Sequence, residues 1–410
     1  MSNMAGRDTI TIEEATDRLI DYRGKTPPKT ESGVRLITAK VVKGGQILNE
    51  PAEFIAADFY DEWMRRGLPQ KHDVLLTTEA PLGEVAILRD EERIALAQRI
   101  ILLRAKPGLI DPHFLFYALQ SDFGQGELKA RASGTTVLGI KQSELRQVRI
   151  PLFLPPTQRR IGAILSAYDE LMENSQRRIR ISEEMARTLY REWFIHFRFP
   201  GHEKHTRIAS SAGKIPKGWT AKSAPECLDI NPRVTVPRAG EKPFVPMGCL
   251  SNDSMVISDI EAREGNSGAK FQNGDTLFAR ITPCLENGKT GFVQFLPSAQ
   301  AVAFGSTEFI VLRSRTLTPE FVYLLARSDE FRGVAIKSMS GATGRQRVQE
   351  RCFNDFPVVE PPLALLDHFS AVVAPSFRLI YELHLQIQNL RQTRDLLLPR
   401  LLSGNLRLNE

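Results

Sequence analysis

Cysteine is scarce in this 410-residue sequence, and all four residues of it lie in the second half: Cys227, Cys249, Cys284 and Cys352. No CxxC pair occurs and the spacing repeats no metal motif, so we expect reduced thiols and neither a disulfide framework nor a zinc site. His202 and His205 form a possible ligand pair. Because no second pair accompanies them, a solvated linker is the simpler interpretation.

Long apolar runs are also missing. No stretch approaches the roughly 18 apolar residues that a membrane-spanning helix requires, and residues 1–19 lack the apolar core of a secretory signal. We therefore expect a cytoplasmic protein that does not enter a membrane.

Neither sign of charge dominates the sequence. The 54 Lys and Arg residues exceed the 48 Asp and Glu residues enough to give a net charge of +6. Such a mild excess is compatible with nucleic-acid binding but lies far below that of histone-like proteins. Any DNA-binding surface must therefore be local, and tight binding to a polyanion is expected to need help from a partner.

Motifs of catalysis are absent from the sequence as well. We find no glycine-rich S-adenosylmethionine fingerprint after a strand-like run, and no Asn-Pro-Pro-aromatic or Asp-Pro-Pro-Tyr tetrad for methylation of an amino group. A GxxxxGK[ST] loop and a carboxylate–lysine nuclease cluster are likewise missing. A self-contained methyltransferase or nuclease is therefore disfavoured.

What the sequence does contain is an internal repeat. Residues 110–136 align without gaps to residues 317–343 at an offset of 207, with identical Pro, Phe, Ser-Asp and Ser-Gly positions. Residues 73–88 also resemble residues 275–293. An ungapped alignment of this length with so many identities is not expected by chance. The chain is therefore expected to consist of two similar halves.

Each half ends in a stretch with coiled-coil periodicity, in which seam positions alternate in steps of four and three. The first seam comprises Ile161, Leu165, Tyr168, Met172, Ser175, Ile179, Ser182, Ala186, Leu189 and Trp193. The second comprises Leu366, Phe369, Val373, Ser376, Ile380, Leu383, Ile387, Leu390, Arg394, Leu397 and Leu401. Because each seam can pack against the other, we expect two long antiparallel helices related by a pseudo-two-fold axis.

Other features of these helices follow from local chemistry. Pro375 is expected to kink or restart the second helix, and Pro399 and Gly404 to mark its end. Glu183 and Arg187 have the spacing of an ion pair on an exposed helix face.

The globular segments are expected to mix strands and helices. Strand-type runs occupy residues 34–42, 73–78, 85–89, 99–105, 275–281 and 307–313. Residues 111–121 and 318–328 begin with an Asp or Thr cap followed by Pro and are therefore expected to be helical. The expected fold class is α+β, with two similar mixed α/β domains at 1–155 and 199–360 and long helices at 156–198 and 361–404.

This organisation resembles the specificity subunit of Type I restriction-modification systems over essentially the whole chain. The segments that carry the resemblance are 22–47, 132–165, 177–194, 278–289 and 394–404. One departure is visible after each proline pair, where the family often has an acidic residue and Gln. Here Thr157-Gln158 and Leu363-Ala364 stand at those places, so we assign no role to that position.

The resemblance implies a function as well as a fold. Each globular half would be a target-recognition domain that reads one half of a split double-stranded DNA site. The paired helices would set the separation and dock two methyltransferase subunits, which would bind S-adenosylmethionine in place of this chain. Two restriction subunits would complete a restriction enzyme. Because the halves differ in sequence, the target is expected to be bipartite and asymmetric.

Base reading requires polar side chains on loops. Arg280 and Lys289 flank the loop ITPCLENG, and Thr77 and Thr78 occupy the corresponding place in the first half. A surface salt bridge is the alternative role for Arg280 and Lys289. A second group surrounds the repeated Ser-Gly pair, where small residues let a backbone approach a phosphate; a tight turn is the alternative. Its members are Ser133, Thr135, Lys141, Ser340, Thr343, Arg345 and Arg347.

A different class of function is also compatible with the pattern. A coiled-coil scaffold or adaptor without DNA specificity would use the same two helices. It would bind partners in a salt-insensitive way and show no sequence preference.

Overall fold

The computed structural model describes residues 8–22, 26–342 and 344–404. The chain divides into two compact units. Unit 1 comprises the residues up to Met172 together with those from Asn389 onward, and unit 2 comprises Glu173–Gln388. Each unit therefore holds one globular half and one segment from each of two long helices, α6 (Pro155–Tyr190) and α10 (Leu363–Leu402).

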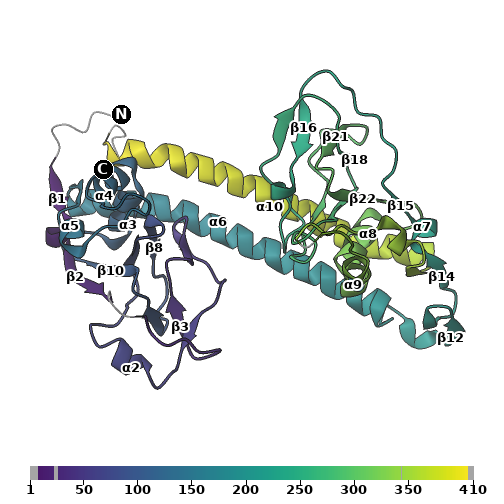
Figure 1. The fold of residues 1–410 in the computed structure, drawn as a ribbon, viewed down its shortest axis with the longest axis horizontal. Helices are drawn as coiled ribbons and strands as arrows, with labels where there is room; N and C mark the ends of the chain where they lie inside the picture. The colour runs from purple at the N-terminus through teal and green to yellow at the C-terminus, as the bar shows by residue number, and fades with distance from the viewer. Residues whose placement is uncertain (1–7, 23–25, 343, 405–410) are drawn as a thin grey trace. The chain divides into compact units, whose positions relative to one another are not determined.

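Unit 1 is built around an antiparallel sheet with the strand order β2-β10-β7-β8 (Figure 1). Its strands are β2 (Thr16–Asp21), β7 (Val74–Thr78), β8 (Leu82–Ile87) and β10 (Ile100–Ala105). A smaller sheet has the order β6-β3-β9, with β3 parallel to β9. The remaining elements are β1 (Thr9–Thr11), α1 (Ile12–Ala15), β3 (Val34–Ile37), β4 (Val42–Lys43), β5 (Gln46–Ile47), β6 (Phe54–Ile55), α2 (Tyr60–Trp63), β9 (Ile94–Leu96), α3 (Pro112–Gln120), α4 (Asp122–Ala130), α5 (Gln142–Arg146) and β11 (Arg149–Pro151).

Unit 2 repeats this topology. Its main antiparallel sheet has the order β15-β22-β19-β20, and its second sheet, β17-β16-β21-β18, again contains one parallel pair, β16 with β21. The elements are β12 (Arg207–Ser210), β13 (Gly213–Pro216), β14 (Thr220–Ser223), α7 (Ala224–Cys227), β15 (Leu228–Ile230), β16 (Lys242–Val245), β17 (Glu261–Arg263), β18 (Ala269–Gln272), β19 (Thr276–Ala279), β20 (Thr290–Phe292), β21 (Val302–Gly305), β22 (Phe309–Ser314), α8 (Pro319–Arg327), α9 (Asp329–Lys337) and β23 (Pro357–Glu360). The prediction of two similar mixed α and β domains is confirmed.

The central strands are apolar along most of their length because both faces of the main sheet are covered. Val74 and Leu76 of β7 join a core that includes Phe114 of α3. Leu75, which lies between them, joins a second core with Leu96 of β9. Since successive side chains of a strand point to opposite faces, one strand supplies both cores. The sheet is therefore the middle layer of unit 1.

The same buried ion pair occurs at the start of β7 and of β19. Asp73 is 2% exposed and its Oδ2 lies 2.7 Å from Arg104 Nη2, whereas Asp275 is 1% exposed and its Oδ2 lies 2.6 Å from Arg313 Nη2. In both units the carboxylate also accepts a hydrogen bond from the backbone amide three residues earlier. A bidentate Arg–carboxylate pair requires a specific geometry, so its recurrence supports the duplication.

The predicted helix starts are confirmed. Asp111 and Thr318 cap α3 and α8 by accepting hydrogen bonds from the backbone amides three residues later, and Pro follows each cap. The run 34–42 is not one strand as expected. It divides into β3 and β4, because the chain turns where the Val41 amide donates to the Thr38 carbonyl.

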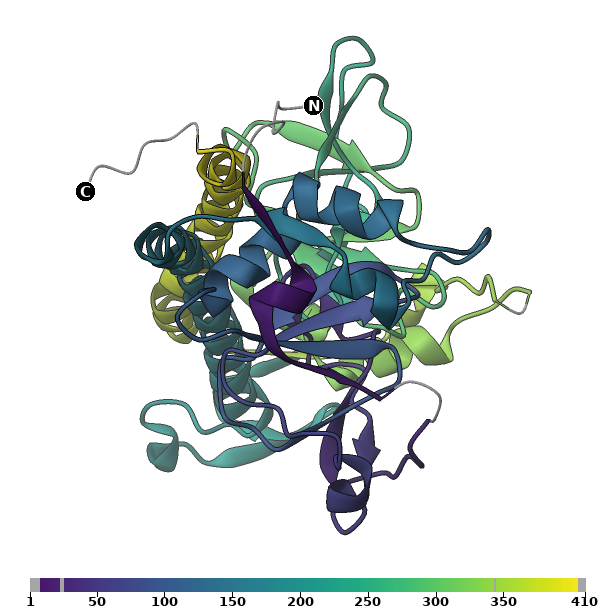
Figure 2. The ribbon, with the colours of Figure 1, turned by 90° about the vertical axis from the view of Figure 1, so that its left-hand side faces the viewer.

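Both seams of the long helices are confirmed, since most of their positions are buried. The helices run antiparallel, as each unit shows separately (Figure 1 and Figure 2). In unit 1, Arg394 Nη1 lies 2.6 Å from Asp169 Oδ1, and Leu401 shares a core with Ile161. In unit 2, the ring of Trp193 packs on that of Phe369.

Two expectations about the helices are wrong. Helix α10 does not restart at Pro375, although it ends at Leu402, between Pro399 and Gly404 as expected. Pro375 lies on the exposed side, where water can hydrate the carbonyl that a proline leaves unbonded. The second expectation concerns Glu183, which does pair with Arg187 at 3.1 Å but is only 6% exposed, so this pair does not lie on an open helix face.

Helix α10 also corrects the expectation that no segment suits a membrane. It is the one helix in the described ranges that is long and apolar enough to span a membrane by length and composition alone. In the fold its seam residues, including Leu366, Phe369 and Val373, are buried against protein. A core helix of a soluble protein passes the same composition test, so this match is weak evidence for a span.

Candidate nucleic-acid interface

In each unit a strand end and the Ser-Gly loop meet at the same place, which we call the corner. In unit 1 the Thr78 amide donates to the Arg99 carbonyl at 3.0 Å, and the Ile140 amide donates to the Thr78 carbonyl at 3.0 Å. In unit 2 the Arg280 amide donates to the Glu308 carbonyl at 3.0 Å, and the Val348 amide donates to the Arg280 carbonyl at 2.8 Å. Thr78 and Arg280 are therefore equivalent, as the sequence predicts.

The Ser-Gly loops are closed at their bases by paired backbone hydrogen bonds. Ser133 and Gly139 exchange two such bonds, of 2.8 and 2.9 Å, and Ser340 and Arg347 exchange two of 3.0 and 2.9 Å. Gly134 has a φ of +116°, and a Cβ atom there would lie 2.2 Å from the Val137 carbonyl oxygen. Only glycine fits this turn, so the tight-turn interpretation holds for the loop of unit 1.

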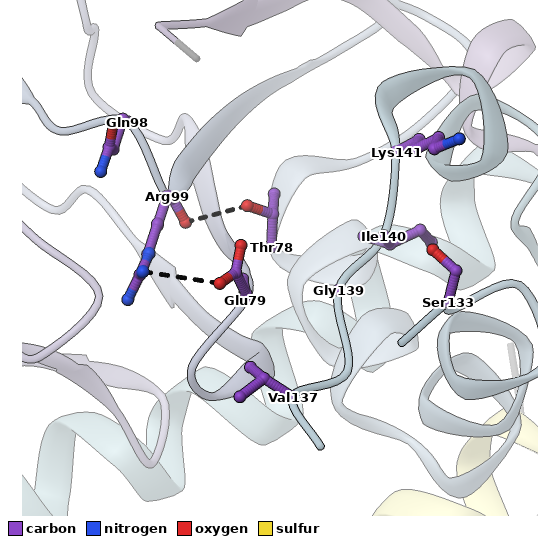
Figure 3. A pocket seen from close by; sticks show the side chains of 9 residues that line it. All are labelled: Thr78, Glu79, Gln98, Arg99, Ser133, Val137, Gly139, Ile140 and Lys141. Atoms are coloured by element: carbon purple, nitrogen blue, oxygen red, sulfur yellow. Dashed lines mark hydrogen bonds and ion pairs between the residues drawn. The ribbon is translucent and has the colours of Figure 1, made fainter. Parts of the chain in front are cut away.

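The corner of unit 1 opens onto a hollow of about 510 Å³ (Figure 3). It is lined by Thr78, Glu79, Gln98, Arg99, Ser133, Val137, Gly139, Ile140 and Lys141. Arg99 Nη2 lies 3.5 Å from Glu79 Oε1 on one side. In Figure 3, Lys141 lies across the hollow from this pair, and its exposed side chain makes no ion pair or hydrogen bond with the described residues. The hollow thus offers two cations and one carboxylate.

A hollow of about 470 Å³ adjoins the corner of unit 2. Its lining comprises Asn231, Pro232, Arg233, Val234, Gly268, Ala269, Lys270, Arg280, Thr307, Phe309 and Val311. Arg280 is fixed at its wall, because its Nη1 lies 2.8 Å from Glu350 Oε1 and its Nη2 donates to the Val348 carbonyl at 3.2 Å. The ion pair that we weighed as the alternative for Arg280 is therefore present.

Two of the residues predicted to contact DNA bind groups of the protein itself. Thr77 is fully buried, and its hydroxyl accepts a hydrogen bond from the Glu84 amide at 2.9 Å. The Lys289 ammonium donates to the carbonyls of Met247 and Leu250 at 3.2 and 2.8 Å. The structure therefore places Thr77 in the core and uses Lys289 to hold a neighbouring loop.

The Ser-Gly group is mostly at the surface. Thr135 and Arg345 are exposed, whereas the Ser340 hydroxyl accepts a hydrogen bond from Gln349 at 2.8 Å. Arg347 pairs with Glu308 at 2.6 Å, and this hydrogen-bonded pairing lowers the pKa of the Glu308 carboxyl. Thr343 lies outside the described residues.

Sequence reasoning missed several residues that line the hollows, including the polar side chains of Gln98, Arg99, Arg233 and Lys270. Gln98 and Arg99 precede β10, and Arg233 and Lys270 lie on segments outside the aligned repeat. A signal for the first pair exists once β10 is known to pair with β7, because Ile100 then lies opposite Thr77 and the preceding Arg99 lies beside Thr78. No comparable signal marked Lys270.

Metal chemistry finds no support in the described ranges, since no cluster of three or more His, Cys, Asp or Glu side chains there is arranged to hold an ion. The four cysteines are not joined to one another in this structure; Cys227 and Cys249 are buried, and Cys284 and Cys352 are partly buried.

Comparison with known proteins points to one family. A family model for the Type I restriction modification DNA specificity domain matches residues 24–183. The MjaIX specificity subunit of Methanocaldococcus jannaschii is 27% identical over 353 residues, which cover 83% of this chain and 79% of that protein. The chain is therefore similar to Type I restriction specificity subunits over most of its length.

Further proteins similar to this chain are also specificity subunits by name, but they match over different lengths. The EcoEI specificity subunit of Escherichia coli is 31% identical over 156 residues, which cover 36% of this chain and only 26% of that protein. The crystal structure of the S subunit from M. genitalium aligns with a TM-score of 0.59 at 16% identity, over 98% of this chain and 97% of that one. This structural likeness concerns the fold, and it extends over both units.

Proposed function

We propose that this chain is the DNA-recognition subunit of a Type I restriction-modification complex, and that it reads an asymmetric bipartite site. Each unit reads one half-site with the loops and strand ends around its corner. The half-sites are unlike because the units are unlike. This chain performs no chemistry itself.

The observation that carries the proposal is one scaffold with two sets of side chains. At equivalent backbone positions unit 1 has Thr78 and Arg99, where unit 2 has Arg280 and Glu308. A shared scaffold presents these positions to DNA in the same way, whereas the hydrogen-bonding groups differ. Since base recognition depends on those groups, the two units select different bases.

Partner subunits supply the chemistry. Methylation of an adenine within a duplex requires that the base be flipped into a pocket, and that pocket, with S-adenosylmethionine, belongs to two methyltransferase subunits. Two restriction subunits add cleavage. The exposed residues Arg177, Arg178 and Arg180 on α6 are suited to contact with such a partner. The complex works in the cytoplasm, where genomic DNA and the cofactor are found.

An exchange of one unit tests the proposal. Residues 205–357 are replaced by the same region of a relative with a known target, and the methylated sequence is determined with the partner methyltransferase present. We expect the second half-site to change and the first to stay.

Two outcomes would contradict this. A change in both half-sites, or in neither, would show that the units do not read DNA separately. Binding that is insensitive to salt and has no sequence preference would instead favour the scaffold function.

A further inference from the structure

The hollow beside the corner of unit 2 has an unusual balance of charge. Three cations line it, Arg233, Lys270 and Arg280, and no Asp or Glu is part of the lining. They come from three separate segments: the loop after β15, strand β18 and the end of β19. Positive groups that converge from distant parts of a chain repel one another, so their arrangement favours an anion between them.

Two of these cations are not neutralised inside the protein. Neither Arg233 nor Lys270 makes an ion pair or a side-chain hydrogen bond with any residue that the structure describes. Arg233 is exposed, whereas Lys270 is half-buried. Because nothing in the described fold neutralises these two cations, an anion that enters the hollow gains both of them as partners.

Neighbouring arginines of the same unit provide a contrast. Arg313 is paired with Asp275 at 2.6 Å, and the exposed Arg315 is paired with Asp229. Arg280 itself is paired with Glu350. The fold therefore pairs these three arginines with carboxylates and leaves Arg233 and Lys270 without one.

The rest of the hollow suits a phosphate better than a base edge. Its floor includes Gly268, where a Cβ would lie 1.9 Å from the Gly305 carbonyl oxygen, so no side chain fills that position. The one amide side chain of the lining, Asn231, already accepts a hydrogen bond from the Val311 amide at 2.8 Å. Bidentate reading of adenine by an amide is therefore not available here.

We propose that Arg233 and Lys270 form a clamp for one phosphate of the DNA backbone that flanks the second half-site. The clamp rests on the proposed function and deepens it, because it positions the duplex on unit 2 without reading its sequence. Arg280, which Glu350 holds at the wall of the hollow, marks the boundary between the clamp and the corner. The hollow of unit 1 differs, because Glu79 is part of its described lining and pairs with Arg99, which leaves Lys141 as the one unpaired cation among the described lining residues.

Salt dependence tests the clamp. The complete complex with its methyltransferase partner is titrated with cognate and unrelated duplexes between 50 and 200 mM salt, using wild type, Arg233→Gln, Lys270→Gln and the double variant. Each lost phosphate contact lowers the slope of log affinity against log salt by about 0.9. We expect each single variant to weaken binding to both duplexes by the same factor, about threefold. The methylated sequence should stay unchanged.

Lys214→Gln is the matched control. It removes the same charge from an exposed position on β13, which is not part of the hollow, and the slope should stay at the wild-type value. A slope that is unchanged in the double variant would overturn the clamp. So would a change of the methylated sequence at one base, because that would make Arg233 or Lys270 a base reader.

A second arm identifies the source of the phosphate. Neutral methylphosphonate groups replace single phosphates along the duplex. Replacement at one position beside the second half-site should weaken DNA binding by the wild type. The same replacement should not weaken binding by the double variant any further. Competition by inorganic phosphate beyond that of chloride at equal ionic strength, with no such position, would assign the hollow to free phosphate and overturn the DNA clamp. If the wild-type complex binds cognate and unrelated duplexes equally well, the proposed function itself is contradicted.

Discussion

At the scale of single residues, the corners place different side chains at one backbone position. Thr78 and Arg280 make equivalent backbone hydrogen bonds, but only Arg280 carries a guanidinium, and Glu350 holds that group in a fixed orientation. Its two terminal nitrogens already bond to Glu350 and to the Val348 carbonyl, so reading of guanine would use their remaining N–H groups. In the proposed function, the Arg280–Glu350 pair therefore orients a reading group and does not act only as a surface ion pair.

Replacement of Arg280 by Ala is expected to weaken binding to cognate DNA about tenfold more than binding to unrelated DNA, since one bidentate base contact contributes roughly 1–3 kcal/mol of discrimination. Competition titrations with both duplexes measure the difference. The companion variant Glu350→Gln keeps the Arg280 guanidinium but removes the carboxylate that orients it. The preference for cognate DNA should then fall by less, about two- to fourfold. An equal loss for cognate and unrelated DNA would reduce Arg280 to a phosphate or structural contact.

At the scale of elements, the helices are joined to the globular parts by buried polar groups as well as by the seam. In unit 1, Asp169 of α6 accepts a hydrogen bond from the Tyr117 hydroxyl of α3 at 2.5 Å. In unit 2, Glu183 of α6 accepts bonds from the Ser254 hydroxyl and the Met255 amide, both at 2.7 Å. These contacts fix α6 against helix α3 in unit 1 and against the loop at residues 254–255 in unit 2, which apolar packing alone does not do.

Glu183 gives a prediction with a defined pH dependence. Burial raises the pKa of its carboxyl, against the opposing effects of the Met255 amide, Ser254 and Arg187. A raised folded-state pKa means that the folded chain holds the proton more tightly than the unfolded chain. The resulting contribution to stability is present below the unfolded pKa and is lost as the pH rises through the folded pKa.

Urea unfolding of wild type, Glu183→Gln and Glu183→Ala measures this effect. Ala leaves the buried Met255 amide without an acceptor and is expected to cost about 1–3 kcal/mol. Gln keeps an acceptor oxygen and should cost less. The stability of wild type relative to Glu183→Gln should increase from pH 7 to pH 4. A difference that is flat or opposite in sign over this range would show that burial does not dominate at Glu183.

Elements with strong local signals were predictable from the sequence. The caps Asp111 and Thr318, each followed by Pro, define α3 and α8 without any tertiary information. The continuity of α10 through Pro375 was not predictable, because it depends on packing elsewhere along the helix and on the exposure of that position. Local propensity predicts a break there, and tertiary packing overrides it.

The candidate site was only partly predictable for a related reason. The repeat located the corners, since Thr78, Ser133 and Lys141 do line one hollow and Arg280 lines another. It could not distinguish Thr77 from Thr78. Both are buried, at 0% and 3% exposure, and the alternation of side chains along the strand decides that only Thr78 lines the hollow. Nor could it assign Lys289, whose backbone acceptors are some 40 residues away in the chain, 42 and 39 residues earlier.

At the scale of the whole molecule, the duplication gives one chain two similar units, as the proposed two-part recognition requires. Both units have the same strand order and the same buried Asp–Arg pair. Both contribute a segment to each long helix. In the proposed function, duplication followed by divergence at the corners preserves the scaffold while it separates the two specificities, which a symmetric dimer of identical chains cannot do.

The most direct test of this account is single-molecule methylome sequencing of cells that express the chain with its partner methyltransferase. We predict a modified motif with two specific and unlike halves separated by a spacer of fixed length and variable sequence. A palindromic motif, a single uninterrupted motif, or methylation without a motif would contradict the account.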